Sequence, residues 1–243
     1  MTSDSGRVRR AVTPQPPGRR TGLTREQILT AAVAIIDADG VEALTMRRLG
    51  QALDRDPMAI YRHAADKDAL LDGVVEHVAA ELITPHESDK NGNGDRDGDW
   101  EAQLRRIAHT FRRVALAHPR VVPLLLTRPL SGPLALRPLG TLQLLEELIE
   151  LFTAAGFDQT GALHAARLFS GFFYGHVLHE LQEQIQNPDE TDDLLRLGLH
   201  RLPITQFPRL RSLATTLAAY DGAAELDEGL TIVLAGLHSQ LRT

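Results

Sequence analysis

Cysteine is absent from this 243-residue chain, and lysine is nearly absent. Without a thiol the chain can form neither a disulfide framework nor a thiolate metal site. The 26 basic residues include only two lysines, Lys67 and Lys90, so arginine supplies nearly all of the positive charge. No run of 18 apolar residues occurs, and the first residues lack the apolar stretch of a signal peptide. We therefore expect a cytoplasmic protein with no membrane span.

The sequence also lacks the common enzyme motifs G-x-S-x-G, G-x-G-x-x-G and the P-loop. One constellation, His176-x-x-His179-Glu180, favours an alternative: two histidines three residues apart share a helix face and could bind zinc. No third ligand is fixed, and Glu180 follows the second histidine instead of lying between the two as in H-E-x-x-H. A metal-dependent all-α enzyme using His176 and His179 is thus the weaker interpretation. We expect no enzyme activity, no bound metal and no cofactor.

Charge is unevenly distributed along the chain. The net charge of −6 by itself argues against a nucleic-acid binder. However, residues 1–25 contain six arginines against one aspartate, and residues 1–66 contain ten arginines against eight acidic residues. The excess of acid therefore lies in the rest of the chain. A basic front and an acidic rear fit a DNA-binding domain attached to a regulatory domain.

Hydrophobic residues recur at helical spacing, and no stretch alternates with period two for long enough to predict a strand. The predicted fold is all-α, with about ten helices. Proline, glycine and arginine make residues 1–22 a flexible basic arm, which either contacts DNA or is a solvated tail. Residues 84–99 read as a flexible linker because most of them are polar, with many Asn, Gly and Asp. They separate a small N-terminal domain, residues 23–83, from a helical domain, residues 100–243.

Within the small domain, residues 44–71 predict three short helices with sharp stops between them. Thr45, Asp56 and Asp66 are suitable N-caps, and Pro57 occupies a first helical position where its missing N–H costs nothing. Two short helices joined by a three-residue turn are the geometry of helix-turn-helix DNA binding. The second helix, predicted over residues 57–63, would enter the major groove, with Ile60 fixing it to its neighbours. Outward-facing candidates for DNA contact are Arg47, Arg48, Met58, Ala59, Tyr61, Arg62, His63 and Lys67.

This stretch resembles the DNA-binding domain of the tetracycline-repressor (TetR) family. The matching residues are Ala31-Ala32, Gly40-x-x-x-Leu44-Thr45, Arg47, Leu49, Ile60-Tyr61-x-His63 and Lys67-x-x-Leu70-Leu71. Together they form a specific signature over about 50 residues. The resemblance implies that Arg47, Tyr61, Arg62, His63 and Lys67 occupy DNA-contacting positions. It also implies double-stranded operator DNA as a partner.

Residues 100–243 resemble, more weakly, the regulatory domain of the same family. The matching pieces are Trp100…Phe111-Arg112-Arg113, Thr127-Arg128-Pro129, Ala155-Gly156-Phe157, Phe172…Gly175-x-Val177-Leu178 and Pro208…Leu230…Gly236-Leu237. The resemblance implies a domain that binds a small-molecule effector and dimerises through a four-helix bundle. The predicted function is a homodimeric, ligand-responsive transcriptional regulator, specifically a repressor that a small effector releases from a palindromic operator. An activator, or an interaction module on the same fold, is the other alternative.

The drug-binding residues of the tetracycline repressor do not carry over to this chain. Its metal-binding His and Glu fall on Leu124 and His179, and a drug-contacting Asn falls on Ile107. We therefore expect an apolar pocket for a hydrophobic or aromatic effector. Its predicted apolar residues are Ile107, Phe111, Leu124 and Leu125, and the candidate polar ones are Arg128, His109, His164 and His176. Alternatively, Arg128 only caps the 121–127 helix, and a lone histidine is more often a structural residue than a ligand contact.

The dimer prediction rests on two apolar helices, around residues 160–185 and 225–241. Gly171-x-x-x-Gly175 would let two helix backbones approach closely, and an isolated helical glycine costs about 1 kcal/mol relative to alanine. Leu230 and Leu237 are the predicted contacts on the last helix. The alternative is that both faces are buried within one protomer.

Overall fold

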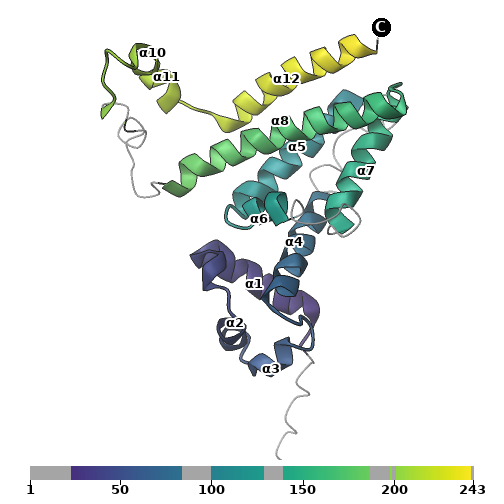
Figure 1. Cartoon of the computed structure of the whole chain (residues 1–243), viewed down its shortest axis with the longest axis vertical. Coiled ribbons are helices and arrows are strands. Elements are labelled where there is room, and N and C mark those ends of the chain that lie inside the picture. Colours follow the sequence, from purple (N-terminus) through teal and green to yellow (C-terminus); the bar gives the residue numbers. More distant parts are fainter. Residues whose placement is uncertain (1–22, 84–99, 129–138, 187–197, 199–200, 242–243) are drawn as a thin grey trace, which may run out of the picture.

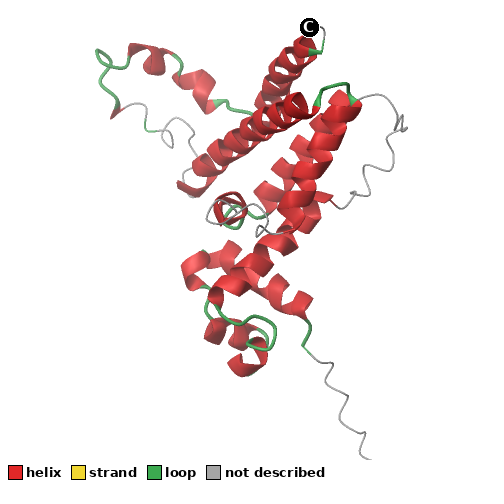
Figure 2. Ribbon diagram, turned by 45° about the vertical axis from the view of Figure 1, so that its right-hand side comes forward, coloured by secondary structure: helices red, strands yellow, loops and turns green. Residues whose placement is uncertain are grey.

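The computed structural model describes residues 23–83, 100–128, 139–186, 198 and 201–241. The predicted arm, residues 1–22, and the predicted linker, residues 84–99, lie outside these ranges. The regular structure of the described residues is entirely helical, with no strand among them, so the all-α prediction is confirmed (Figure 2). None of the helices in these ranges is long and apolar enough to cross a bilayer.

The N-terminal helices surround a small apolar core. They are α1 (Arg25–Asp39), the 3-10 turn η1 (Val41–Ala43), α2 (Met46–Ala52), α3 (Pro57–Ile60) and α4 (Lys67–Ile83). Thr45, Asp56 and Asp66 accept bonds from backbone N–H groups at the starts of α2, α3 and α4, as predicted. Ile60 is fully buried, as predicted from its position on α3. These caps and this core hold a helix that is too short to form alone.

The second helix of the motif is shorter than predicted. Helix α3 ends at Ile60, and residues 61–63 continue as a turn in place of the expected helix to His63. The His63 N–H donates to the Ile60 carbonyl at 2.8 Å, which tightens the chain into a 3-10-type turn. The turn between α2 and α3 contains Asp54 at φ 51°, a left-handed conformation that Asp tolerates better than most residues.

The remaining helices form the larger part of the molecule (Figure 1). Helices α5 (Trp100–Ala117), α6 (Val122–Thr127) and α7 (Leu139–Ala154) lie between α4 and the long α8 (Gln159–Gln186). Short α10 (Pro208–Ser212) and α11 (Ala214–Ala218) precede α12 (Gly222–Gln240), which packs along α8. The start of α7 lies on α4, since a β-carbon on Gly140 would come within 2.8 Å of Ala79 Cβ. Helix α4 therefore belongs to both parts of the molecule.

Candidate functional site

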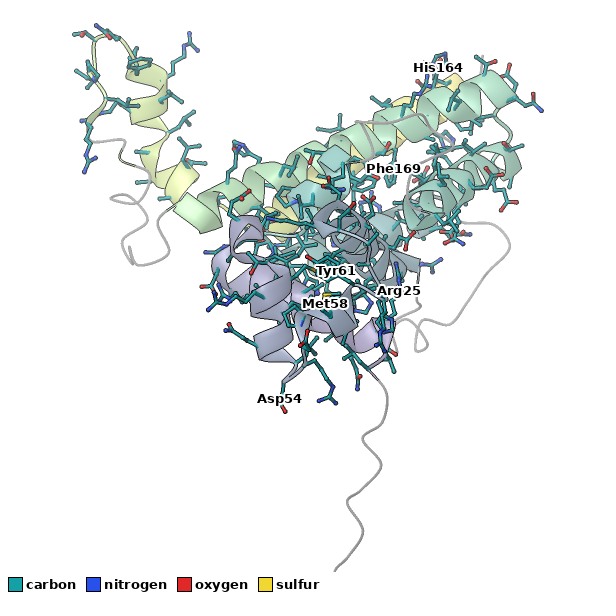
Figure 3. The ribbon with its side chains drawn as sticks, turned by 60° about the horizontal axis from the view of Figure 1, so that its bottom comes forward. Arg25, Asp54, Met58, Tyr61, His164 and Phe169 are labelled. Carbon is teal, nitrogen blue, oxygen red and sulfur yellow. The ribbon has the colours of Figure 1, made fainter. Side chains whose placement is uncertain are left out.

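The end of the molecule formed by α2 and α3 exposes most of the predicted DNA contacts. Met58 is 68% exposed and Tyr61 is 45% exposed, whereas Ile60 between them is fully buried. Figure 3 shows Met58, Tyr61 and Asp54 at this end. Arg47, Arg62 and His63 are also exposed, and Ala59 is half-buried. The structure thus brings these predicted residues onto one region of the small domain.

Two of the predicted DNA contacts are ion-paired within the chain. Arg48 Nη2 donates a hydrogen bond to Asp39 Oδ2 at the end of α1. Lys67 Nζ lies 3.9 Å from Glu42 Oε2. Both positive charges are therefore partly neutralised by carboxylates of the same chain.

A groove of about 620 Å³ is lined by the end of α2, the turn after it and the first residue of α3. Gln51 and Arg55 line it together with Arg47, and neither was predicted as a site residue. The signal for Gln51 was available, because it lies one helical turn after Arg47. Arg55 gave no such signal, since its position in the turn follows from the left-handed conformation at Asp54.

The predicted apolar effector residues lie in and around an aromatic cluster between α5 and α8. Phe111 and Leu125 are buried, while Ile107 and Leu124 are half-buried and pack against the same core. The centre of the Phe111 ring lies 5.0 Å from the ring centres of both Phe173 and Tyr174. Tyr174 was missed by the sequence reasoning. Burial raises the pKa of Tyr174 to about 12, so its hydroxyl stays protonated at neutral pH and offers a polar group among the aromatic rings.

The three histidines predicted as polar points of the pocket do not come together. His109 Nε2 lies 2.8 Å from Asp227 Oδ1, and His176 Nε2 lies 2.9 Å from the Gly222 carbonyl oxygen, so both bind α12. His164 is exposed near the start of α8 (Figure 3). The expectation that they share one pocket is corrected, because α12 occupies the side of α5 and α8 to which two of them point.

Arg128 connects α6 to α4. Its Nε donates to Asp72 Oδ1 at 2.9 Å, and its Nη2 donates to the Asp68 carbonyl at 3.2 Å. Its Nη1 also lies 3.4 Å from Asp68 Oδ1. This fork on α4 differs from a simple cap of α6, which would place the guanidinium on the last carbonyls of its own helix.

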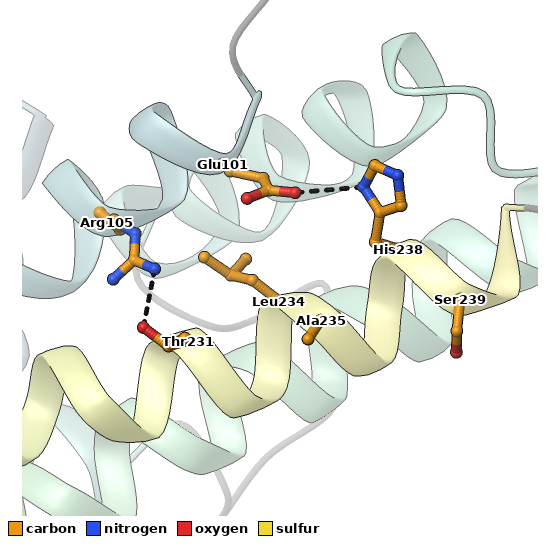
Figure 4. Close-up of a pocket in the computed structure, with 7 residues that line it drawn as sticks. All are labelled: Glu101, Arg105, Thr231, Leu234, Ala235, His238 and Ser239. Carbon is orange, nitrogen blue, oxygen red and sulfur yellow. Dashed lines mark hydrogen bonds and ion pairs between the residues drawn. The ribbon is translucent and has the colours of Figure 1, made fainter.

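A second groove, of about 510 Å³, lies between α5 and α12 (Figure 4). Arg105 Nη2 donates to Thr231 Oγ1 at 3.0 Å on one side of it, and His238 Nδ1 lies 3.2 Å from Glu101 Oε1 on the other. These polar pairs join α5 to α12 and were not foreseen from the sequence.

The predicted dimer contacts divide into two groups. Leu230 and Leu237 are buried within the protomer, so assigning them to the interface is wrong: α12 turns this face towards α5 and α8 of its own chain. Gly171 and Gly175 are exposed, and apart from the neighbouring backbone of α8 itself, no described atom lies within 4 Å of a β-carbon built on either. Leu168 and Ile232 are 57% and 74% exposed, so outward faces of α8 and α12 carry apolar groups in the single protomer.

Comparison with known proteins identifies the fold and its use. The profile of "Bacterial regulatory proteins, tetR family" matches residues 28–74, and that of "Tetracyclin repressor-like, C-terminal domain" matches residues 93–241. The chain belongs to the TetR family. The predicted resemblance is thereby confirmed, and the protein is a transcriptional regulator of the ligand-responsive, dimeric, operator-binding kind.

Three similar proteins illustrate the relationship. An HTH-type transcriptional regulator of Saccharopolyspora erythraea is 31% identical over 88% of this chain and 84% of its own length. The HTH-type transcriptional repressor DrrR1 of Streptomyces coeruleorubidus is 28% identical over 75% of this chain and 66% of its own. The solved Streptomyces coelicolor TetR family protein ActR, in complex with actinorhodin, has a TM-score of 0.67, 28% identity, and coverage of 91% of this chain and 99% of that one.

Proposed function

We propose that this TetR-family protein is a repressor that leaves a two-fold-symmetric operator when a small hydrophobic or aromatic effector binds its helical domain. The observation that carries the proposal is the connection between the two parts: α4 begins beside α3 and is bonded by Arg128 to α6. The relatives support both halves of the proposal, since DrrR1 is named a repressor and ActR was solved with actinorhodin.

On DNA, each subunit of the dimer would place α3 in a major groove, with the two helices about 34–36 Å apart on one face of the duplex. Tyr61, His63 and Lys67 are suited to hold phosphates, while the longer reach of Arg47 suits a guanine edge. Met58 and Ala59 carry no side-chain hydrogen-bonding group, so they can read only thymine methyls or the shape of the groove. We therefore expect an operator different from that of the tetracycline repressor.

Arg47→Ala is expected to weaken operator binding by about 1–3 kcal/mol and to relax the preference at one base pair, because a bidentate guanine contact is lost. The operator is first selected from a random-sequence duplex library with the wild-type protein, and affinity is then measured for every single-base variant. Arg106→Ala, which removes an exposed arginine from α5, is the matched control. Unchanged affinity and selectivity of Arg47→Ala would show that Arg47 does not read the groove.

In the helical domain, an effector that displaces α6 would pull α4 through the two carboxylates bound by Arg128. Only residues 61–66 separate α3 from the start of α4, so a shift of α4 changes the separation of the two reading helices. The effector must bind the conformation with displaced α6 more tightly than the DNA-binding conformation, because otherwise it does not shift the equilibrium between them.

Arg128→Lys is expected to bind operator normally but to need about tenfold more effector for release, because a lysine cannot reproduce the forked contact to Asp68 and Asp72. The effector is obtained by screening hydrophobic and aromatic compounds, actinorhodin first, for release of labelled operator. Arg105→Lys, which changes an arginine bound to α12, is the control. Release at the wild-type concentration would assign Arg128 to a purely structural role.

We infer further that the protein has no catalytic activity and acts in the cytoplasm, where the chromosomal DNA lies. No observation favours the enzyme alternative: His176 binds the Gly222 carbonyl, His179 is exposed, and the described residues contain no cluster of three side chains able to hold a metal. Metal analysis of the purified protein tests this inference, since a stoichiometric transition metal lost in His179→Ala would contradict it.

A further inference from the structure

The last turn of α1 is bound from two sides at three consecutive residues. Asp37 Oδ2 lies 2.7 Å from His118 Nδ1, and the Ala38 carbonyl accepts a hydrogen bond from Arg120. Asp39 accepts the hydrogen bond of Arg48. His118 and Arg120 follow α5 in the regulatory domain, whereas Arg48 belongs to α2 of the DNA-binding motif. One helical turn therefore contacts both parts of the protein.

The charges of this turn explain why it needs positively charged partners from other parts of the chain. Asp37 and Asp39 place negative charge at the C-terminus of α1, where the helix dipole is also negative, and the last turn has no basic residue of its own. The last four carbonyls of a helix lack partners within it, and Arg120 supplies one for Ala38. Cations from α2 and from the segment after α5 therefore stabilise a turn that is electrostatically unfavourable by itself.

The Asp37 side chain ties the turn closely to the regulatory domain. Its side chain is only 22% exposed, and Oδ1 is buried with no hydrogen-bond partner within the described part of the chain. The carboxylate consequently relies on His118, whose other nitrogen, Nε2, lies 3.5 Å from Glu81 on α4. A displacement of His118 would leave the half-buried Asp37 carboxylate without this partner, although its Oδ1 already has none within the described residues.

On the opposite side, Arg48 orients α2. Thr45 caps this helix through the Arg48 N–H, at 3.1 Å, so the backbone and the side chain of Arg48 are both fixed. Arg47, the candidate base-reading residue, is its neighbour. We propose that Arg48 is a positioning residue rather than a DNA contact, and that the last turn of α1 transmits the position of His118 and Arg120 to α2. This contact route begins at the first residues of α6, where the His118 carbonyl accepts the Val122 N–H at 3.1 Å, whereas Arg128 binds α4 from the other end of α6. The inference rests on the operator-binding function proposed above.

Two substitutions distinguish a positioning role of Arg48 from a phosphate contact. Asp39→Asn is expected to weaken operator binding about three- to tenfold, as Arg48→Ala does, because either change releases α2 from α1. If Arg48 bound phosphate, Asp39→Asn would instead strengthen binding by removing a negative charge. The salt dependence gives a second readout: loss of a phosphate contact lowers the slope of log K against log salt by about one per contact, whereas loss of positioning leaves it unchanged.

Transmission through the turn is tested by a double-mutant cycle of His118→Ala and Arg48→Ala in the full-length dimer. The probe is the duplex selected from a random library by the wild-type protein, so failure of wild type to select any duplex refutes the operator-binding function itself. The two side chains do not touch the same residue. We nevertheless expect the double variant to lose about three- to tenfold less affinity than the product of the single losses, because releasing either side already frees the turn.

The control cycle pairs His118→Ala with Arg25→Ala. Arg25, at the start of α1, donates to Glu76 Oε2 on α4 at 3.2 Å. The losses of operator affinity caused by Arg25→Ala and His118→Ala should therefore be additive in free energy. If His118→Ala fails to fold, Arg120→Ala replaces it in both cycles, since Arg120 is exposed. Additive losses in the test cycle, or tighter binding by Asp39→Asn, would overturn the proposal.

Discussion

Arg112→Ala is expected to lower the free energy of unfolding by about 3–5 kcal/mol, because it leaves the buried Glu180 carboxylate without its partner. Arg112 Nε donates to Glu180 Oε2 at 2.9 Å and Nη2 donates to Oε1 at 2.6 Å, which joins α5 to α8. The Glu180 side chain is only 7% exposed. Helix α12 begins against the same carboxylate, since a β-carbon on Gly222 would lie 2.2 Å from Glu180 Oε1. Denaturant unfolding of the dimer at fixed protein concentration measures the loss.

Two variants show whether the loss comes from the unpaired charge. Arg113→Ala removes the neighbouring exposed arginine and should change stability by less than about 0.5 kcal/mol. Replacing both partners, as in Arg112→Met with Glu180→Leu, should recover most of the lost stability, because an apolar pair needs no compensation for desolvation. A double variant no more stable than Arg112→Ala would mean that the bidentate geometry itself holds α5 to α8.

Ile232→Asp is expected to separate the subunits, raising the dimer dissociation constant roughly 100-fold or more. Ile232 is 74% exposed on α12, and we propose that the partner subunit covers it together with Leu168, Gly171 and Gly175 of α8. An unpaired charge buried in such an interface costs about 3–5 kcal/mol, which corresponds to that change in affinity. Sedimentation measures the dissociation, and operator affinity should fall with it, because one subunit cannot span both half-sites.

The control for the dimer interface is Leu139→Asp. Leu139 is 68% exposed at the start of α7, outside α8 and α12, so its substitution should leave the dimer intact. Leu230→Asp serves as a contrast: Leu230 is fully buried in its own protomer, so this variant should unfold the domain rather than release a folded monomer. A dimeric Ile232→Asp protein with wild-type operator affinity would place the interface on a different face.

The α2–α3 motif shows how much local sequence can determine. Thr45, Asp56 and Asp66 define the helix starts, and Ile60 defines the buried side of α3, because caps and apolar spacing act over a few residues. The end of α3 was not predictable to the residue, since helix ends tighten into 3-10 turns according to their surroundings. The all-α class and the family followed from the same local patterns.

Partners distant in the chain were decided by tertiary packing alone. Apolar spacing predicted Leu230 and Leu237 as dimer contacts, and the Gly-x-x-x-Gly spacing predicted Gly171 and Gly175. Only the packing of α12 on α5 and α8 showed that the leucines are internal and the glycines face outwards. Likewise, the sequence does not indicate which carboxylate each cation meets. Arg48 pairs with Asp39, His118 with Asp37 and Arg128 with Asp72, over separations of 9, 81 and 56 residues. Helical periodicity indicates which side of a helix is apolar. Which other helix covers that side, and which carboxylate pairs with each arginine, depends on how the whole chain packs.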